Sequence, residues 1–173
     1  MTDWQACMRR YSGPMKQLLA GILGLLVLSL PGTAGAQQST QATIFATSRL
    51  VIVGQSGRHE FAVEIAVTPE QRAQGLMYRR SMAAEAGMLF DFGRRAGRAS
   101  MWMKNTYIPL DMLFIKADGE IESIAARTVP HSLESISSRG PVRGVLELNG
   151  GTAARLGIRP GDRIEHRLFG TAD

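Results

Sequence analysis

The stretch His59-Glu-Phe-Ala-Val-Glu-Ile-Ala-Val67 alternates between apolar and polar side chains, and it decides the fold class. Successive side chains of a strand point to opposite faces, so this period predicts a half-buried β-strand. The apolar face would hold Phe61, Val63, Ile65 and Val67. A second apolar run, Leu50 to Val53, lies just before it, across a loop that begins and ends with glycine. The two runs predict a β-hairpin.

A short helix is predicted directly after the hairpin. Thr68 can cap it, Pro69 suits the first helical turn, and Gln71 completes a capping-box pattern. The helix should run to about Gly75.

Further short apolar segments extend the β pattern along the rest of the chain. Asp118-Gly119 is the strongest hairpin signal, residues 128–141 form an irregular loop, and residues 151–156 form one or two helical turns that end at Gly157. The predicted strands are residues 87–92, 99–104, 110–115, 120–126, 142–148 and 163–168. We therefore expect a mostly β (α+β) fold, a single compact small barrel or sandwich-like domain with about seven or more short strands and two short helices.

The first 36 residues resemble a secretory signal peptide. Basic residues precede the apolar run Leu18 to Leu30, and an Ala-Gly-Ala pattern ends at Ala36. The run would span roughly 20 Å as a helix, less than the roughly 30 Å hydrocarbon core of a membrane. We predict cleavage after Ala36, a flexible lead-in over residues 37–44, and a domain over residues 45–170. The alternative is a leader retained as a membrane anchor.

Charge and cysteine content narrow the function classes. Removal of the leader would take away three basic residues and one acidic residue, so the formal charge would fall from +5 to +3. The remaining basic residues are scattered, which does not favour nucleic-acid binding. The single cysteine, Cys7, lies in the leader, so the mature chain would use neither disulfides nor thiol chemistry. These features predict a periplasmic or secreted protein with no transmembrane segment after cleavage.

Four motifs, in order along the chain, resemble a known family. They are T-P-E-Q-R-A-Q-G-L-M-Y-R-R (68–80), G-M-L-F-D-F (87–92), W-M-K-N-T-Y-I-P-L-D-M-L-F-I (102–115) and V-L-E-L-N-G-G (145–151). Together they are similar to the bacterial domain of unknown function 192. The resemblance implies a compact β-rich domain, often exported, and it implies no activity.

Polar residues interrupt the apolar stretch from Met101 to Phe114, where a buried polar group must be satisfied. Lys104 and Asp111 could form an ion pair across a turn that Asn105 stabilises, which is a structural explanation. Alternatively, Lys104, Asn105 and Asp111 form the floor of a site for a small polar or anionic ligand, with Trp102 as a wall. In that case Lys104 would hold an anionic group and Asp111 would orient it or exchange a proton.

Other charged residues among apolar neighbours are candidates for the same site. We expect an ion pair between Arg79 and Asp91, with participation in the ligand site as the alternative. Glu147 is flanked by leucines and is a potential buried partner for Lys104. Asn149 is expected to cap the second short helix.

Metal binding and serine chemistry are further hypotheses. Cu(I) would suit thioether and imidazole ligands, but the methionines also fit core positions. The copper candidates are Met77, Met82, Met88, Met101, Met103, Met112 and His131. His59, His131 and His166 lack the spacing of a zinc site. His131 and the loop around Ser132, Glu134, Ser135, Ser137 and Ser138 lack a G-x-S-x-G elbow. No cofactor is predicted.

Three function classes follow. The first is a module that binds a small polar ligand or a partner protein through Trp102, Lys104, Asn105 and Asp111. The second is a hydrolase or lyase in which Lys104 and Asp111 are the acid/base pair. The third is a structural module associated with an envelope protein.

Overall fold

The computed structural model describes residues 43–94 and 97–172. They belong to the second of two compact units, which spans residues 40–173. The predicted signal peptide and most of the predicted lead-in lie outside the described residues. None of the helices among the described residues is long and apolar enough to cross a membrane.

Nine strands and two short α-helices make up the described part of the chain, which confirms the predicted mostly β fold. The strands are β1 (Ala46–Gly54), β2 (Gly57–Ala66), β3 (Ala86–Asp91), β4 (Ser100–Met101), β5 (Leu110–Ile115), β6 (Ile121–Thr128), β7 (Ile136–Ser137), β8 (Gly144–Asn149) and β9 (Arg163–Glu165). The helices are α1 (Pro69–Gln74) and α2 (Thr152–Leu156), and a 3₁₀ turn covers Arg167–Phe169.

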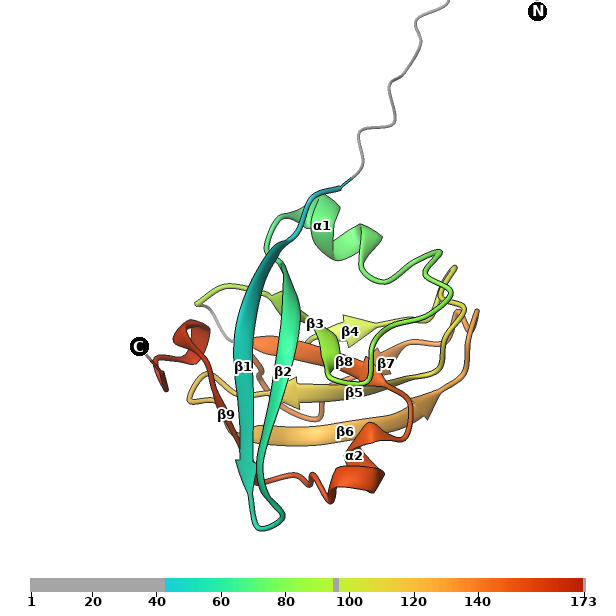
Figure 1. Cartoon of the computed structure of the whole chain (residues 1–173). Helices are drawn as coiled ribbons and strands as arrows, with labels where there is room; N and C mark the ends of the chain where they lie inside the picture. Colours follow the sequence, from blue (N-terminus) through green and yellow to red (C-terminus); the bar gives the residue numbers. More distant parts are fainter. Residues whose placement is uncertain (1–42, 95–96, 173) are drawn as a thin grey trace, which may run out of the picture. The chain divides into compact units, whose positions relative to one another are not determined.

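Seven strands form one curled sheet in the order β6-β5-β8-β3-β2-β1-β9, and β4 pairs with β7 in a separate ribbon (Figure 1). The pairings are antiparallel except that of β2 with β3, whose crossover contains α1. The two edge strands of the sheet, β6 and β9, approach each other at one corner, where Glu120, just before β6, forms a β-bridge with Arg163 of β9. There the Ile121 amide donates to the Asp162 carbonyl at 2.8 Å.

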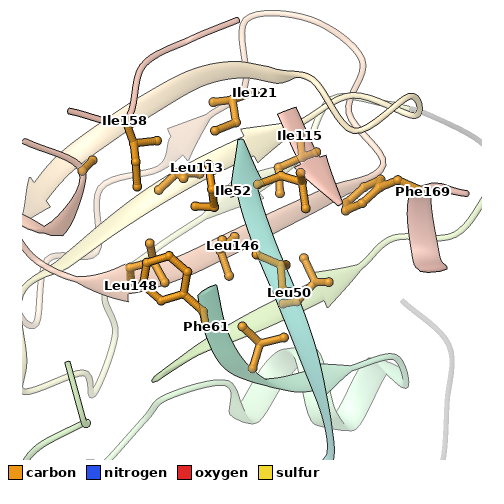
Figure 2. Close-up of a cluster of buried hydrophobic side chains, with 14 of the residues drawn as sticks. Leu50, Ile52, Phe61, Leu113, Ile115, Ile121, Leu146, Leu148, Ile158 and Phe169 are labelled. Atoms are coloured by element: carbon orange, nitrogen blue, oxygen red, sulfur yellow. The ribbon is translucent and has the colours of Figure 1, made fainter. Parts of the chain in front are cut away.

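The core has two layers, one on each face of the sheet. The inner layer, shown in Figure 2, gathers side chains from strands across the sheet, and Leu50, Leu113 and Leu146 in it are fully buried. The outer layer contains Met88, Phe90 and Met112 together with Leu76 from the turn after α1 and with residues from β4 and the following loop. The central strands β3, β5 and β8 are therefore buried on both faces, and a charged residue on them is unusual.

Local signals in the sequence predicted several elements correctly. β1 and β2 form the predicted hairpin, with Gly54 paired to Gly57 across a tight turn. The capping box at α1 is present, because the Gln71 amide donates to the Thr68 hydroxyl at 3.2 Å and the Thr68 amide donates to the Gln71 side chain at 3.0 Å.

Three predicted elements differ. The strand expected over residues 99–104 is only Ser100–Met101, because the chain leaves the strand at Trp102 and turns at Lys104 and Asn105. The loop of residues 128–141 contains β7, which pairs with β4. The last strand ends at Glu165, since His166 caps a 3₁₀ turn by accepting the Leu168 amide at 3.1 Å.

Candidate functional site

Glu147 is the buried carboxyl at the centre of the candidate site. It lies on β8, paired with Met88 of β3 on one side and with Met112 of β5 on the other. Its residue surface is only 4% exposed. The sheet therefore places an acidic side chain in the apolar outer core, between two methionines.

The carboxyl group of Glu147 forms no hydrogen bond or ion pair with any residue in the described part of the chain, although it lines a pocket. Burial raises its pKa from the ordinary value of 4.5 to about 8. The reason is desolvation, because no nearby cation or amide compensates the charged form. At neutral pH the carboxyl is thus mostly protonated and can donate a hydrogen bond.

A narrow pocket leads from the surface to Glu147. Its volume is about 30 Å³, which holds about two water molecules. The walls come from α1 with the turn after it, from β3, and from the segment of residues 101–106. The lining residues are Arg72, Ala73, Gln74, Gly75, Leu76, Met77, Phe90, Met101, Trp102, Lys104, Thr106 and Glu147.

Lys104 and Trp102 stand together at this pocket. The Lys104 ammonium lies 5.0 Å from the centre of the Trp102 ring, a cation-π contact. Within the described residues Lys104 has no acidic partner within 4.0 Å, and Trp102 is 49% exposed. Three of the predicted site residues, Trp102, Lys104 and Glu147, therefore line one pocket.

Asn105 shapes the loop instead of lining the pocket. It has a left-handed backbone with φ of 55°. Its carbonyl accepts the Tyr78 amide, and its side-chain amide donates to the Tyr78 hydroxyl, both at 2.8 Å. These bonds hold the turn after Lys104 against the segment after α1, and they set the position of the pocket wall.

The predicted ion pair between Lys104 and Asp111 is wrong. Asp111 is fully buried and accepts three backbone amides, from Arg127 at 2.8 Å, Gly151 at 2.9 Å and Ala153 at 2.8 Å. It therefore caps the start of α2 from a distant strand. The expected cap, Asn149, instead donates to the Met82 and Ala83 carbonyls.

The predicted ion pair between Arg79 and Asp91 is also wrong. Arg79 forms a bidentate pair with Glu64, with one contact of 2.7 Å. Asp91 accepts the Gly93 amide at 2.8 Å, and its nearest cationic group is the Arg143 guanidinium at 3.8 Å. Neither Arg79 nor Asp91 lines the Glu147 pocket.

The residues proposed for metal or serine chemistry lie in separate parts of the domain or contact one another through hydroxyl groups. Met88, Met103 and Met112 are fully buried in the outer core. The ring centres of His131 and Tyr107 lie 5.1 Å apart. In the described ranges no three histidine, cysteine or acidic side chains gather as a metal site. The hydroxyls of Ser100 and Ser135 lie 3.0 Å apart, and Ser100 also contacts Ser137.

The model of the family DUF192, described as an uncharacterised ACR, matches residues 51–166. The chain belongs to the DUF192 family. A search of curated proteins found no match to it.

Two solved structures resemble this DUF192 protein. A protein of Sinorhizobium meliloti 1021, provisionally described as a transcription regulator, is 55% identical with a TM-score of 0.71; the match covers 73% of this chain and 98% of that one. A protein of unknown function from Novosphingobium aromaticivorans DSM 12444 is 39% identical with a TM-score of 0.68, over 76% and 99% of the two chains. Both structures consist almost entirely of the domain described here.

Sequence reasoning missed the part of the pocket that α1 contributes. Arg72, Gly75 and Leu76 belong to the capped helix and the turn after it, but nothing in their local pattern shows that this segment packs over β8. The sequence marks Met88 and Met112 as core or copper candidates but does not place them beside Glu147, because the order of β3, β8 and β5 is not visible in it.

Proposed function

We propose that this DUF192 protein is an exported binding module that holds a small polar molecule in the Glu147 pocket. The observation that carries the proposal is a buried carboxyl in the lining of an accessible pocket, with no partner among the described residues. Such a group costs stability, and strongly perturbed pKa values are concentrated at functional sites.

The chemistry of the lining suits a ligand that accepts hydrogen bonds. The protonated Glu147 carboxyl would donate one bond, and the Lys104 ammonium would supply positive charge near the mouth. Trp102 offers an exposed ring surface for the part of the ligand outside the pocket. Because only about 30 Å³ is enclosed, one small group such as a carboxylate, an amide or a hydroxyl would enter.

Export is the second part of the proposal, and the leader supports it. Residues 1–36 combine basic residues, an apolar run and an A-x-A pattern. The regulator description of the S. meliloti protein does not enter the proposal, because the pocket favours a small molecule.

A titration that follows Trp102 fluorescence tests the ligand. The only other tryptophan, Trp4, lies in the leader, so residues 37–173 contain a single reporter. Formate, acetate, acetamide and glycerol are the first probes. We expect a saturable signal that Glu147→Leu and Lys104→Met each weaken at least tenfold. Lys116→Met is the matched control, because Lys116 pairs with Glu120 outside the pocket. A signal that persists unchanged in both pocket variants would refute the site.

A proton-transfer enzyme is the second candidate. The pKa of about 8 for Glu147 is close to the range that general acid/base catalysis uses. The acid/base pair of Lys104 and Asp111 does not form, so Glu147 would carry the proton. Turnover of a bound probe that disappears in Glu147→Gln, with binding retained, would favour this candidate over a binding module.

A further inference from the structure

A second hollow is lined by residues at the ends of β6 and β8 and at the start of α2, and it shares no lining residue with the Glu147 pocket. Figure 1 labels these three elements. Its volume is about 360 Å³, and it opens to solvent. It is lined by Ala84, Arg127, Asn149, Gly150, Gly151, Thr152 and Arg155. None of these residues lines the Glu147 pocket. We propose that this hollow binds a phosphate or phosphoester group between Arg127 and Arg155.

The backbone places Arg127 in a defined position. The pairing of β5 with β6 contains a bulge between Leu110 and Met112, and Arg127 lies in it. Arg127 has a left-handed backbone with φ of 48°, and its amide donates to Asp111 at 2.8 Å. The same carboxylate accepts the amides of Gly151 and Ala153. One buried aspartate therefore fixes both walls of the hollow relative to each other.

Gly151 allows the Arg127 guanidinium to approach the opposite wall. A Cβ atom at Gly151 would lie 3.0 Å from a nitrogen of that guanidinium, and Gly151 also has φ of 91°. A larger residue at Gly151 would displace the guanidinium, so the close approach depends on glycine.

The charge of the hollow is uncompensated within the described residues. The guanidinium groups of Arg127 and Arg155 form no hydrogen bond or ion pair there, and no acidic side chain is part of the lining. Thr152 also lines the hollow. Two guanidinium groups match the oxygens and the double negative charge of a phosphate.

The test measures binding of inorganic phosphate to residues 37–173, which contain the whole of the compact unit that spans residues 40–173. Calorimetry and thermal unfolding are carried out at constant ionic strength, with chloride as the balancing anion. We expect saturable binding and a rise in melting temperature. Arg127→Ala and Arg155→Ala should each weaken binding at least tenfold, and Arg127→Lys should weaken it because the planar fork is lost.

Arg159→Ala is the control, since it removes an equal charge from an exposed arginine outside the lining. If Arg127→Ala unfolds the domain, Arg155→Ala decides, because Arg155 is an exposed residue of α2.

Equal binding by the arginine variants and the parent protein, or an effect of phosphate no larger than that of chloride, overturns the proposal. Tighter binding of malonate than of phosphate overturns the choice of phosphate. Glu147→Leu should leave phosphate binding unchanged, which separates this site from the Glu147 pocket.

Discussion

Individual residues in this domain divide into those that stabilise the fold and those that oppose it. Asp111 and Glu147 are both acidic and both buried, and they lie on neighbouring strands, because Asp111 pairs with Leu148, the residue after Glu147. Asp111 accepts three amides, whereas Glu147 has no partner among the described residues. Their opposite environments predict opposite effects of removing the charge.

The parent protein should lose stability as pH rises, and Glu147→Gln should remove that loss. The pKa of Glu147 is 4.5 when exposed and about 8 in the fold, so between these values the folded state binds more protons than the unfolded state. The contribution of the protonated Glu147 to the free energy of unfolding is therefore complete below pH 4.5 and is lost progressively as pH rises to about 8. At pH 7 the loss is about 3 kcal/mol, at 1.36 kcal/mol per pH unit.

Chemical unfolding of the parent protein and of Glu147→Gln from pH 4 to pH 8.5 measures this effect. The two should be equally stable at pH 4 and differ by about 3 kcal/mol at pH 7. Glu134→Gln, at an exposed loop position, is the control and should follow the parent protein. A difference that does not change with pH would contradict the assignment of Glu147 as a neutral buried acid.

Asp111→Asn should destabilise the protein by about 3 kcal/mol or more. The substitution puts an amide NH₂ where a carboxylate oxygen accepts backbone N–H groups, and it leaves buried donors without partners. Lys104→Met should be nearly neutral, since Lys104 has no acidic partner in the described region. Thermal unfolding of the two variants measures both effects. Equal losses would indicate that the two residues act as a pair after all.

At the scale of elements, the helices and turns follow from residues close together in the chain, while the sheet does not. The β1–β2 hairpin, the capping box of α1 and the Gly157 end of α2 were predictable because each depends on a few adjacent residues. The cap of α2 was not, since it comes from Asp111 on β5. Likewise, β7 was missed because only its pairing with β4 makes Ile136–Ser137 a strand.

Thr68→Ala should cost about 1 kcal/mol of unfolding free energy, because the first amides of α1 lose their cap. Thr68→Ser keeps the hydroxyl and should retain most of the stability. Denaturant unfolding of both variants gives the comparison. If the alanine and serine variants were equally destabilised, the lost methyl group, not the cap, would be the cause.

At the scale of the whole molecule, the sequence predicted a compact β domain but not which of its polar residues would meet. Trp102, Lys104 and Glu147 were candidates and do line one pocket. Arg127 was overlooked, because its position depends on a bulge and on a remote carboxylate. Contacts between distant strands decide such sites, and a single sequence carries little information about strand order.

Export makes a separate prediction for the full chain. Expression in a bacterial host should yield a periplasmic protein whose first residue is Gln37. Leu26→Arg interrupts the apolar run of the leader and should keep the protein inside the cell with its leader intact. Cell fractionation followed by mass spectrometry measures both results. An intact leader on membrane-bound parent protein would support the anchor alternative.

The contact between β1 and β9 has a consequence for how the chain folds. Val51 near the beginning of the domain pairs with Glu165 near its end, so the outer side of β1 has no partner until nearly the whole chain is available. Such distant pairing slows folding, because a long loop must close before the contact forms. Under the proposed export, this delay would keep the chain extended until its last strand has crossed the membrane.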